Sequence, residues 1–326
     1  MLFEFAPEQD FNFLTSFAER FKVPVQGNKL TIPASLGEGN IRIFNLEPDY
    51  KLLIHRYKLK EDFFLKRNAV INPTDLVSII FNSNEESVSS TTAGKNHFHI
   101  SRNSAYAIQI ASSDLESVIR FPANTNIYFT VIGIRATRLK EILRIKKPNS
   151  VVQTIVSGSA DFLFHETMGT NVQKLLKQLT DAGEENQLSD FYHRIKIEEL
   201  LYLVFEQLLK RETINHSPIH KAEIEKLYLI RTALLADLSR PPRLAELAQM
   251  AGLSETKMKG LFKQVFGESI FNYFQKARMD EAAFLLKHGG VSVSEAGHEL
   301  GFTNLSHFGR VFEKHYSLNP KKYSSV

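Results

Sequence analysis

The sequence contains no cysteine and no long apolar run. Without cysteine there can be no disulfide, no thiolate metal site and no cysteine nucleophile, and the chain suits a reducing compartment. No apolar segment reaches the roughly 18 residues that a transmembrane helix needs. The N-terminal stretch MLFEFAPEQDF has acids where a signal peptide has basic residues. We therefore expect a cytoplasmic protein that has no membrane partner.

Recognisable enzyme motifs are also missing. The sequence has no GxSxG nucleophile motif, no P-loop, no HExxH zinc motif and no dinucleotide fingerprint. Isolated acids such as Asp114, Glu116 and Glu141 do not have the spacing of a catalytic pair. The sequence therefore indicates no catalytic residue and no cofactor.

The residues that are present favour a folded chain with two domains. Its 326 residues are 43% apolar, without low-complexity tracts or short-period repeats. The formal net charge is only +4, but from Lys226 onward 14 basic residues face 9 acidic ones. A basic C-terminal region is typical of a nucleic-acid-binding module, although this surplus is small.

Apolar spacing divides the chain into a β-rich part and a helical part. Up to about residue 145, short alternating runs such as 127–134 are separated by turn-forming residues. After Pro148 the spacing becomes helical, including a long segment that begins near Ser189. We predict an α+β protein with two domains. The first covers 1–212, β-rich over 1–145 and helical over 165–212; a polar linker follows at 213–220, and an all-α domain occupies 221–326.

Residues 244–266 have the pattern of a helix-turn-helix. Ala248 is small where two helices must cross, Gly252 can adopt the positive φ that ends a helix, and Ser254 can cap the next helix. The residues left facing outward could meet bases or phosphates, or could form an ordinary solvated helix face. The candidate DNA-contacting residues are Glu255, Thr256, Lys257, Lys259, Gly260 and Lys263.

A second helix-turn-helix is predicted over residues 292–316. Ser292 and Glu295 form an S-x-x-E capping pattern, Gly301 ends the first helix, and the second helix starts near Asn304. Arg310 is the best base-reading candidate because a guanidinium matches guanine O6 and N7; a phosphate contact or an internal ion pair is the alternative. The candidate residues of this unit are Thr303, Asn304, Ser306, His307, Arg310 and Lys314.

Between the two units, residues 269–287 form a long amphipathic pattern. A single connecting helix can hold two recognition helices so that they enter successive major grooves, about 34 Å apart. Two recognition helices that each have low sequence specificity then give one specific complex with DNA.

Four motifs in this region resemble the AraC/XylS family of bacterial transcription regulators. They are LAxxAGLS within Leu244–Ser254, RMxxAxxLL at Arg278–Leu286, GFxxxSHFxRVFxKxY at Gly301–Tyr316 and NPxxY at Asn319–Tyr323. The resemblance covers about the last 100 residues. The segment 219–238 looks closest to the siderophore-responsive branch typified by the regulator of pyochelin uptake.

The resemblance implies a regulator, more often an activator than a repressor. Its partners would be double-stranded DNA, RNA polymerase, an unknown small-molecule effector and a second copy of the chain. It also implies that the first domain is a cupin-like barrel followed by helices. The family often has arginine where Gly260 stands, so one DNA contact is absent here.

Two features of the first domain allow alternatives. Residues 191–209 could pair two copies of the chain or could only cover the barrel. His97 and His99 could start a cupin metal site, but no acid follows between Ile100 and Tyr106, so we expect no metal.

Three hypotheses for the whole protein remain. The first is an effector-responsive regulator, and the second gives the first domain only an oligomerisation role. The third is a barrel enzyme fused to a DNA-binding tail, as in some DNA-repair proteins. A pocket lined by apolar and polar side chains would favour sensing, whereas a filled barrel would disfavour it.

Overall fold

A computed structural model describes residues 1–8, 11–70, 74–83, 89–91, 98–99, 106–112, 115–158, 161–182, 187–211, 219 and 221–325. The chain divides into two compact units, Met1–Glu225 and Lys226–Val326, called here the first and the second unit. Of the predicted linker 213–220, only Ile219 belongs to the described residues. The boundary that we placed there stays a prediction.

The described strands of the first unit form an eight-stranded and a five-stranded sheet. Their orders are β13-β10-β7-β12-β5-β4-β3-β2 and β1-β6-β11-β8-β9. All described pairings are antiparallel except that between β1 and β6. The strands are β1 (Leu2–Phe5), β2 (Val25–Gln26), β3 (Lys29–Thr31), β4 (Gly37–Glu47), β5 (Tyr50–Leu59), β6 (Phe63–Arg67), β7 (Leu76–Ser83), β8 (Ser89–Thr91), β9 (Phe98–His99), β10 (Tyr106–Ser112), β11 (Ser117–Phe121), β12 (Asn126–Arg135) and β13 (Leu163–Thr167).

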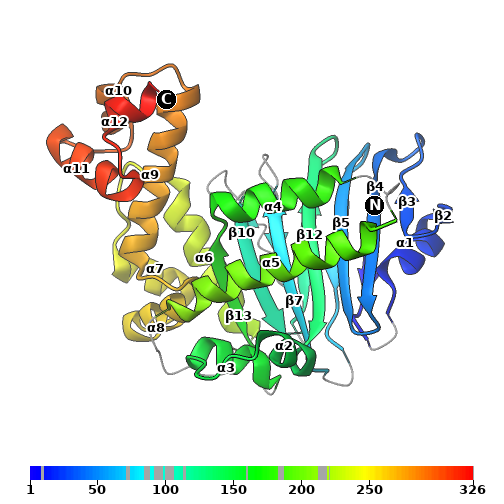
Figure 1. Cartoon of the computed structure of the whole chain (residues 1–326). Coiled ribbons are helices and arrows are strands. Elements are labelled where there is room, and N and C mark those ends of the chain that lie inside the picture. The colour runs from blue at the N-terminus through cyan, green and yellow to red at the C-terminus, as the bar shows by residue number, and fades with distance from the viewer. Residues whose placement is uncertain are drawn as a thin grey trace. The chain divides into compact units, whose positions relative to one another are not determined.

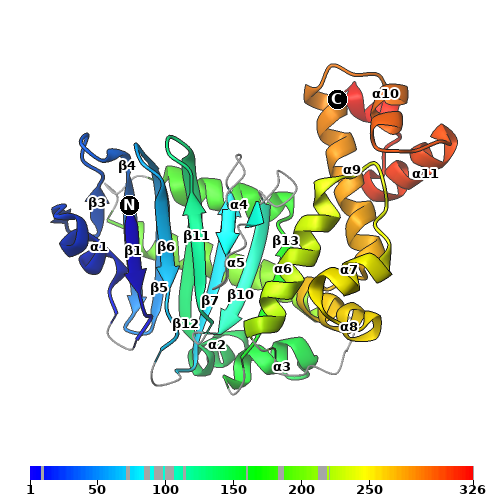
Figure 2. The ribbon, with the colours of Figure 1, turned by 180° about the vertical axis from the view of Figure 1, so that it is seen from behind.

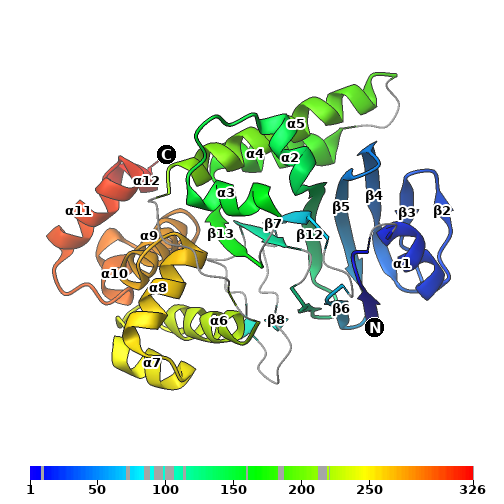
Figure 3. The same cartoon turned by 90° about the horizontal axis from the view of Figure 1, so that it is seen from below.

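Successive apolar residues of the central strands contribute to two separate hydrophobic cores, one on each face of the large sheet. On β12, Ile132 and Ile134 belong to the core beneath the helices, whereas Phe129 belongs to the core shared with the five-stranded sheet. Successive side chains of a strand point to opposite faces, so apolar residues at both parities bury both faces of this strand. Figure 3 shows helices α2 to α5 on one side of the large sheet and β6 and β8 on the other.

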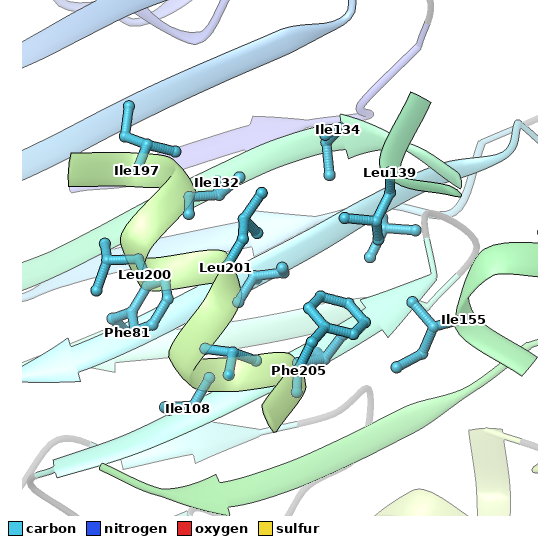
Figure 4. Packing of buried hydrophobic residues seen from close by; sticks show 14 of the residues in the cluster. Phe81, Ile108, Ile132, Ile134, Leu139, Ile155, Ile197, Leu200, Leu201 and Phe205 are labelled. Atoms are coloured by element: carbon cyan, nitrogen blue, oxygen red, sulfur yellow. The ribbon is translucent and has the colours of Figure 1, made fainter. Parts of the chain in front are cut away.

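The helices of the first unit are α1 (Phe13–Phe21), α2 (Ala136–Leu143), α3 (Ser150–Ser157), α4 (Thr170–Asp181) and α5 (Ser189–Leu209). The predicted start of the long helix at Ser189 is confirmed. Helix α5 lies across the large sheet, and its Ile197, Leu201 and Phe205 pack near Ile132 and Ile108 (Figure 4). This packing anchors the helical layer on the sheet.

One element of the first unit was not expected. The predicted helical region 165–212 contains α4 and α5, but its first residues, up to Thr167, belong to strand β13, which pairs with β10. Strand β13 has five residues, too few for an alternating pattern to stand out from a helical one. Pairing with a strand more than 50 residues earlier in the chain decides its conformation.

The second unit is built from helices, as predicted. They are α7 (Leu244–Ala251), α8 (Glu255–Phe266), α9 (Ile270–His288), α10 (Val293–Glu299), α11 (Leu305–Tyr316) and α12 (Pro320–Ser324), preceded by α6 (Lys221–Ala236), which spans the division between the units. The long helix α9 contacts α8 on one side of the connection and α10, α11 and α12 on the other. Figures 1 and 2 show the two groups at opposite ends of α9. Among the described residues, no helix is both long and apolar enough to cross a bilayer.

Candidate nucleic-acid interface

Helices α7 and α8 form the first predicted helix-turn-helix. Gly252 has a φ of 58° and ends α7, and the N–H of Leu253 donates to the carbonyl of Ala248 at 3.0 Å. The Ser254 hydroxyl accepts from the N–H of Lys257 at 3.3 Å and so caps α8. The glycine end and the serine cap were both predicted, and both are confirmed.

The first set of predicted DNA-contacting residues lies on the solvent side of α8. Only Lys263 is half-buried; the other five are exposed, namely Glu255, Thr256, Lys257, Lys259 and Gly260. The Lys259 ammonium is 2.9 Å from a Glu255 carboxylate oxygen, one helical turn away. A phosphate that binds Lys259 must therefore compete with an internal partner, although an exposed pair of this kind is worth little in water.

Gly260 leaves open space on the same helix. A Cβ built at this glycine meets no atom within 4 Å, outside its own helical backbone. No packing contact therefore requires glycine here, although glycine lowers the stability of the helix by about 1 kcal/mol relative to alanine. The neighbouring surface can accommodate a longer side chain.

Helices α10 and α11 form the second predicted helix-turn-helix. Ser292 and Glu295 make the reciprocal capping box, with the Glu295 carboxylate accepting from the Ser292 N–H at 2.7 Å. The hydrogen bond from the Ser292 side chain, followed by that from its backbone, lowers the pKa of Glu295. The capping pattern read from the sequence is confirmed.

Two glycines allow close packing in the second helix-turn-helix. A Cβ at Gly297 would lie 2.7 Å from Leu305 Cδ2, so α10 and α11 cross closely at this position. Gly301 has a φ of 75°, and a Cβ there would lie 1.8 Å from the Ser239 carbonyl oxygen. The sequence identified Gly301 as the end of the helix, but it did not reveal the Ser239 contact or the role of Gly297.

The six candidate residues of the second set are all exposed: Thr303, Asn304, Ser306, His307, Arg310 and Lys314. Asn304 also has a structural role, since its Oδ1 accepts from the N–H of His307 at 3.0 Å and caps α11. Arg310 Nε donates a long bond of 3.4 Å to the Ser306 carbonyl in its own helix. Its guanidinium lies at the surface and can meet a base or a phosphate.

Arg278 of the connecting helix α9 binds the second helix-turn-helix. Its side chain is 5% exposed, and its Nε and Nη2 both donate to the Leu300 carbonyl at the end of α10, Nε at 3.1 Å. The guanidinium carbon lies 3.9 Å from the centroid of the Phe302 ring. Burial lowers the pKa of Arg278. The RMxxAxxLL motif contains this arginine, but the sequence did not show which carbonyl it binds.

Asp280, also on α9, holds the recognition helix itself. Its carboxylate accepts from the Tyr316 hydroxyl at 2.8 Å, and His315 Nε2 lies 3.4 Å from the same oxygen. Burial, together with the negative charge of Asp280, raises the pKa of Tyr316. At the other end of the connector, Arg231 donates to the Tyr273 hydroxyl at 2.7 Å. The connector is therefore hydrogen-bonded to the second helix-turn-helix through Arg278 and Asp280 and to α6 through Tyr273.

The predicted dimer helix α5 has two different apolar faces. Leu200, Val204 and Leu208 are buried against the sheet, whereas Phe191 and Ile195 are 60% and 46% exposed. Along residues 191–209 the buried face of α5 is centred on Leu200 and Leu201, so Phe191 and Ile195 are not part of it. The exposed face remains available for pairing.

A cavity of about 160 Å³ lies in the first unit, among residues of both sheets. Its walls combine apolar side chains with the polar side chains of His55, Arg67 and Ser78. By contrast, the predicted histidine pair is not part of the description: His97 lies outside the described residues, and nothing is described of the His99 side chain.

Comparison with known proteins identifies the second unit. A family model described as "Helix-turn-helix domain" matches residues 247–325. An uncharacterised HTH-type transcriptional regulator of Haemophilus influenzae is 30% identical over 127 residues, which are 38% of this chain and 42% of that protein. The HTH-type transcriptional activator RhaR of Mannheimia succiniciproducens is 27% identical over 154 residues, 47% of this chain and 54% of that protein.

A solved structure of an AraC-type transcriptional regulator from Chromobacterium violaceum is 24% identical, covering 32% of this chain and 95% of that one, with a TM-score of 0.31. The chain spans about half the length of the curated relatives it matches. Together, the family match, the relatives and the capped tandem units agree with the motifs read from the sequence. Residues 247–325 of this chain form a helix-turn-helix domain, and the motifs in this region resemble those of the AraC/XylS family.

Proposed function

We propose that this protein is a sequence-specific transcription regulator that reads two successive major grooves and responds to a small molecule. The observation that carries the proposal is the pair of helix-turn-helix units on one helix, α9, which packs against α8 of the first and is hydrogen-bonded to the second through Arg278 and Asp280. Each unit exposes polar and basic residues on its second helix, α8 or α11. A rigid connector of this kind sets the separation that two grooves require.

Within this proposal the exposed residues have different roles. Arg310 reads a base, because a guanidinium can donate two parallel bonds to guanine. Lys259, Lys263 and Lys314 neutralise phosphates, which strengthens binding to any sequence. No residue is assigned a catalytic role, and the relatives are named as transcriptional regulators and activators rather than enzymes. Two of these relatives are named activators, which supports activation, and the proposal then implies RNA polymerase as the protein partner.

The first unit would supply the effector site and the dimer contact. The cavity between the sheets supports sensing over a purely oligomeric role, because a filled interior would leave no room for a ligand. For the dimer, exposed apolar residues recur at intervals of seven along α5, starting from Leu188 at its N-cap: Leu188, Ile195, Tyr202 and Leu209. A seven-residue spacing keeps side chains on one face of a helix, as pairing with another helix requires. The assignment to the pyochelin-regulator branch and to a cupin-like barrel stays a prediction.

The test is selection of bound sequences from a random DNA pool by the purified full-length protein at a stated salt concentration. We expect enrichment of a motif with two elements about one helical turn, or roughly 34 Å, apart. If nothing is enriched, either alone or with candidate effectors, the proposed function is wrong.

Variants then separate base reading from phosphate binding. Arg310→Ala should reduce the preference for the selected site over random DNA by about 1–3 kcal/mol. Lys259→Ala should weaken both complexes equally and reduce the salt dependence by about one phosphate contact. Lys140→Ala, which removes an exposed charge from α2 in the first unit, is the matched control and should change neither. Equal losses on both DNAs for Arg310→Ala would show that it binds only phosphate.

A further inference from the structure

The cavity of the first unit has the size of a single-ring ligand. Its volume is about 160 Å³. A protein cavity of about 150 Å³ is known to hold benzene, so this space fits one six-membered ring with a small substituent.

Register-paired side chains of the large sheet form one wall of the cavity. Leu53 of β5, Val131 of β12 and Ile80 of β7 are partners in the sheet and make an apolar row across it. Two residues along the same strands, His55 and Phe129 form the next row. Residues two apart on a strand point to the same face, so both rows face the cavity. The wall is therefore apolar in its middle and has a polar ring, His55, beside that apolar part.

The charges in the wall balance. Two acids, Glu8 and Asp49, and two bases, Lys51 and Arg67, are among the described lining residues. Arg67 is engaged within the protein, since its Nη2 donates to the Ser112 carbonyl at 3.0 Å and the residue takes part in further interactions. A charged ligand would lose its hydration here without meeting a net opposite charge. The wall therefore favours an uncharged ligand.

Aromatic rings provide flat surfaces around the same space. His55 stacks on Phe129 with ring centroids 3.9 Å apart, and Phe13 meets His55 edge-on at 4.9 Å. Phe5 and Phe11 also line the cavity and stack on each other at 5.2 Å. Rings prefer stacked and edge-on neighbours, which favours an aromatic occupant over a flexible chain.

His55 supplies a neutral hydrogen-bonding group. It is 2% exposed, and its Nδ1 has no hydrogen-bond partner among the described residues. Burial lowers the pKa of His55 to about 3, so the ring is uncharged at neutral pH. A neutral imidazole has one donor and one acceptor nitrogen, and a hydroxyl group both donates and accepts, so the two can pair in either tautomer. A ligand hydroxyl would thus satisfy a buried polar group that is otherwise costly to leave unpaired.

Gly133 keeps another part of this space open. On β12 it is the partner of Lys51 and Ser78, and all three line the cavity. A Cβ built on Gly133 meets nothing within 4 Å, and its φ does not require glycine. A larger side chain at this position would enter the cavity without displacing the backbone.

We propose that this cavity binds an uncharged monocyclic aromatic compound with one hydroxyl group, its ring among the aromatic and aliphatic side chains and its hydroxyl on His55. The inference deepens the effector-sensing part of the proposed function and rests on it. An unsubstituted ring, an aromatic anion and an aliphatic alcohol are the competing ligand classes, and the experiment distinguishes them.

The experiment is isothermal titration of the full-length protein at about pH 7 with p-cresol, toluene, benzoate and hexan-1-ol. A phenol ionises only at about pH 10, so p-cresol is uncharged under these conditions. It should bind best. Toluene, which has the ring but no hydroxyl, and benzoate, which has the ring and a charge, should each bind at least about 10-fold more weakly. Hexan-1-ol, which has the hydroxyl but no ring, should also bind more weakly.

The probes can also contradict the proposed ligand class. Tighter or equal binding of benzoate would show that the cavity takes an anion. Equal binding of toluene would remove the hydroxyl from recognition, and equal binding of hexan-1-ol would remove the ring. Each of these results, or no binding of p-cresol, would overturn the assignment.

Two glycine variants locate the site. Gly133→Leu should fill the cavity and raise the Kd for p-cresol by at least about 100-fold without lowering the Tm. Gly169→Leu is the matched control, because Gly169 is exposed at the start of α4, also leaves its Cβ position free of contacts and does not line the cavity. Its Kd should not change. Unchanged binding in Gly133→Leu would place the ligand elsewhere.

A third variant tests the hydroxyl contact. His55→Phe keeps an aromatic ring but has no nitrogen, so the Kd for p-cresol should rise about 10-fold while that for toluene stays within about twofold. A purely structural role of His55 would shift both values together. Equal weakening of the two probes would therefore show that the hydroxyl does not bind His55.

The inference and the proposed function can fail separately. If the protein selects a DNA motif but binds none of the probes, the ligand assignment is wrong while the DNA-binding role stands. If p-cresol binds in a Gly133-dependent way but leaves DNA affinity unchanged, the cavity assignment stands and the effector role is wrong. A change in DNA affinity with p-cresol that Gly133→Leu abolishes supports both.

Discussion

Replacing Arg278 by methionine tests how the connector holds the second recognition helix. Methionine has a similar length but no donors, so the Leu300 carbonyl loses both bonds from the guanidinium and Phe302 loses its stacked cation. Hydrogen bonds from a charged group contribute about 1.5–3 kcal/mol. A desolvated cation–π contact contributes about 1–2 kcal/mol.

Part of this loss is offset. The variant no longer buries a charge, and the lowered pKa of Arg278 shows that burial disfavours its charged form. We therefore expect a net loss of about 2 kcal/mol in the stability of α10 and α11, a factor of about 30 in their local opening. Arg278→Lys should fall in between, because an ammonium keeps the charge but lacks the forked, stacking geometry.

Hydrogen exchange of the full-length protein, read by mass spectrometry, measures this effect region by region. Amides of 293–316 should exchange about 30-fold faster in Arg278→Met, while those of α7 stay unchanged. Arg243→Met, which removes an 85% exposed side chain paired with Glu246 at 3.6 Å, is the control and should alter neither region. Unchanged exchange of α10 and α11 in Arg278→Met would refute the reasoning, and uniform acceleration would show a global effect instead.

Three further predictions concern stability. Gly260→Ala should stabilise the second unit by about 1 kcal/mol, since its Cβ meets no neighbour, and urea denaturation followed by circular dichroism would measure it. Gly301→Ala should destabilise the unit by at least about 2 kcal/mol, because φ is 75° and the Ser239 carbonyl occupies the Cβ position; an unchanged unfolding midpoint would contradict this. Burial lowers the pKa of His55 from its usual 6.5 to about 3. Between these pH values the unfolded chain therefore binds a proton at His55 and the folded chain does not. The first unit should lose about 2 kcal/mol between about pH 7 and pH 5, and His55→Phe should remove that loss; an unchanged pH dependence in the variant would count against it.

The second unit was predictable because its signals are local. The caps at Ser254 and Ser292 and the helix ends at Gly252 and Gly301 depend on residues a few positions apart, which the sequence shows directly. The outward positions of α8 and α11 followed from the helical period, although the helix cap formed by Asn304 was missed. Whether these residues bind DNA remains a prediction.

The remaining features depend on contacts between distant segments. Strand β13 exists because β10 pairs with it. Helix α5 buries the face centred on Leu200 because that face packs on apolar residues of the large sheet. The roles of Arg278 and Gly297 appear only when α9, α10 and α11 are packed together.

The sequence by itself therefore determined the helix boundaries and the tandem units of the C-terminal domain, since hydrogen bonds within a few residues specify them. Only the tertiary structure decided which side chains line the cavity, since these residues come from separate strands and the helical and strand periods do not reveal which strands face one another.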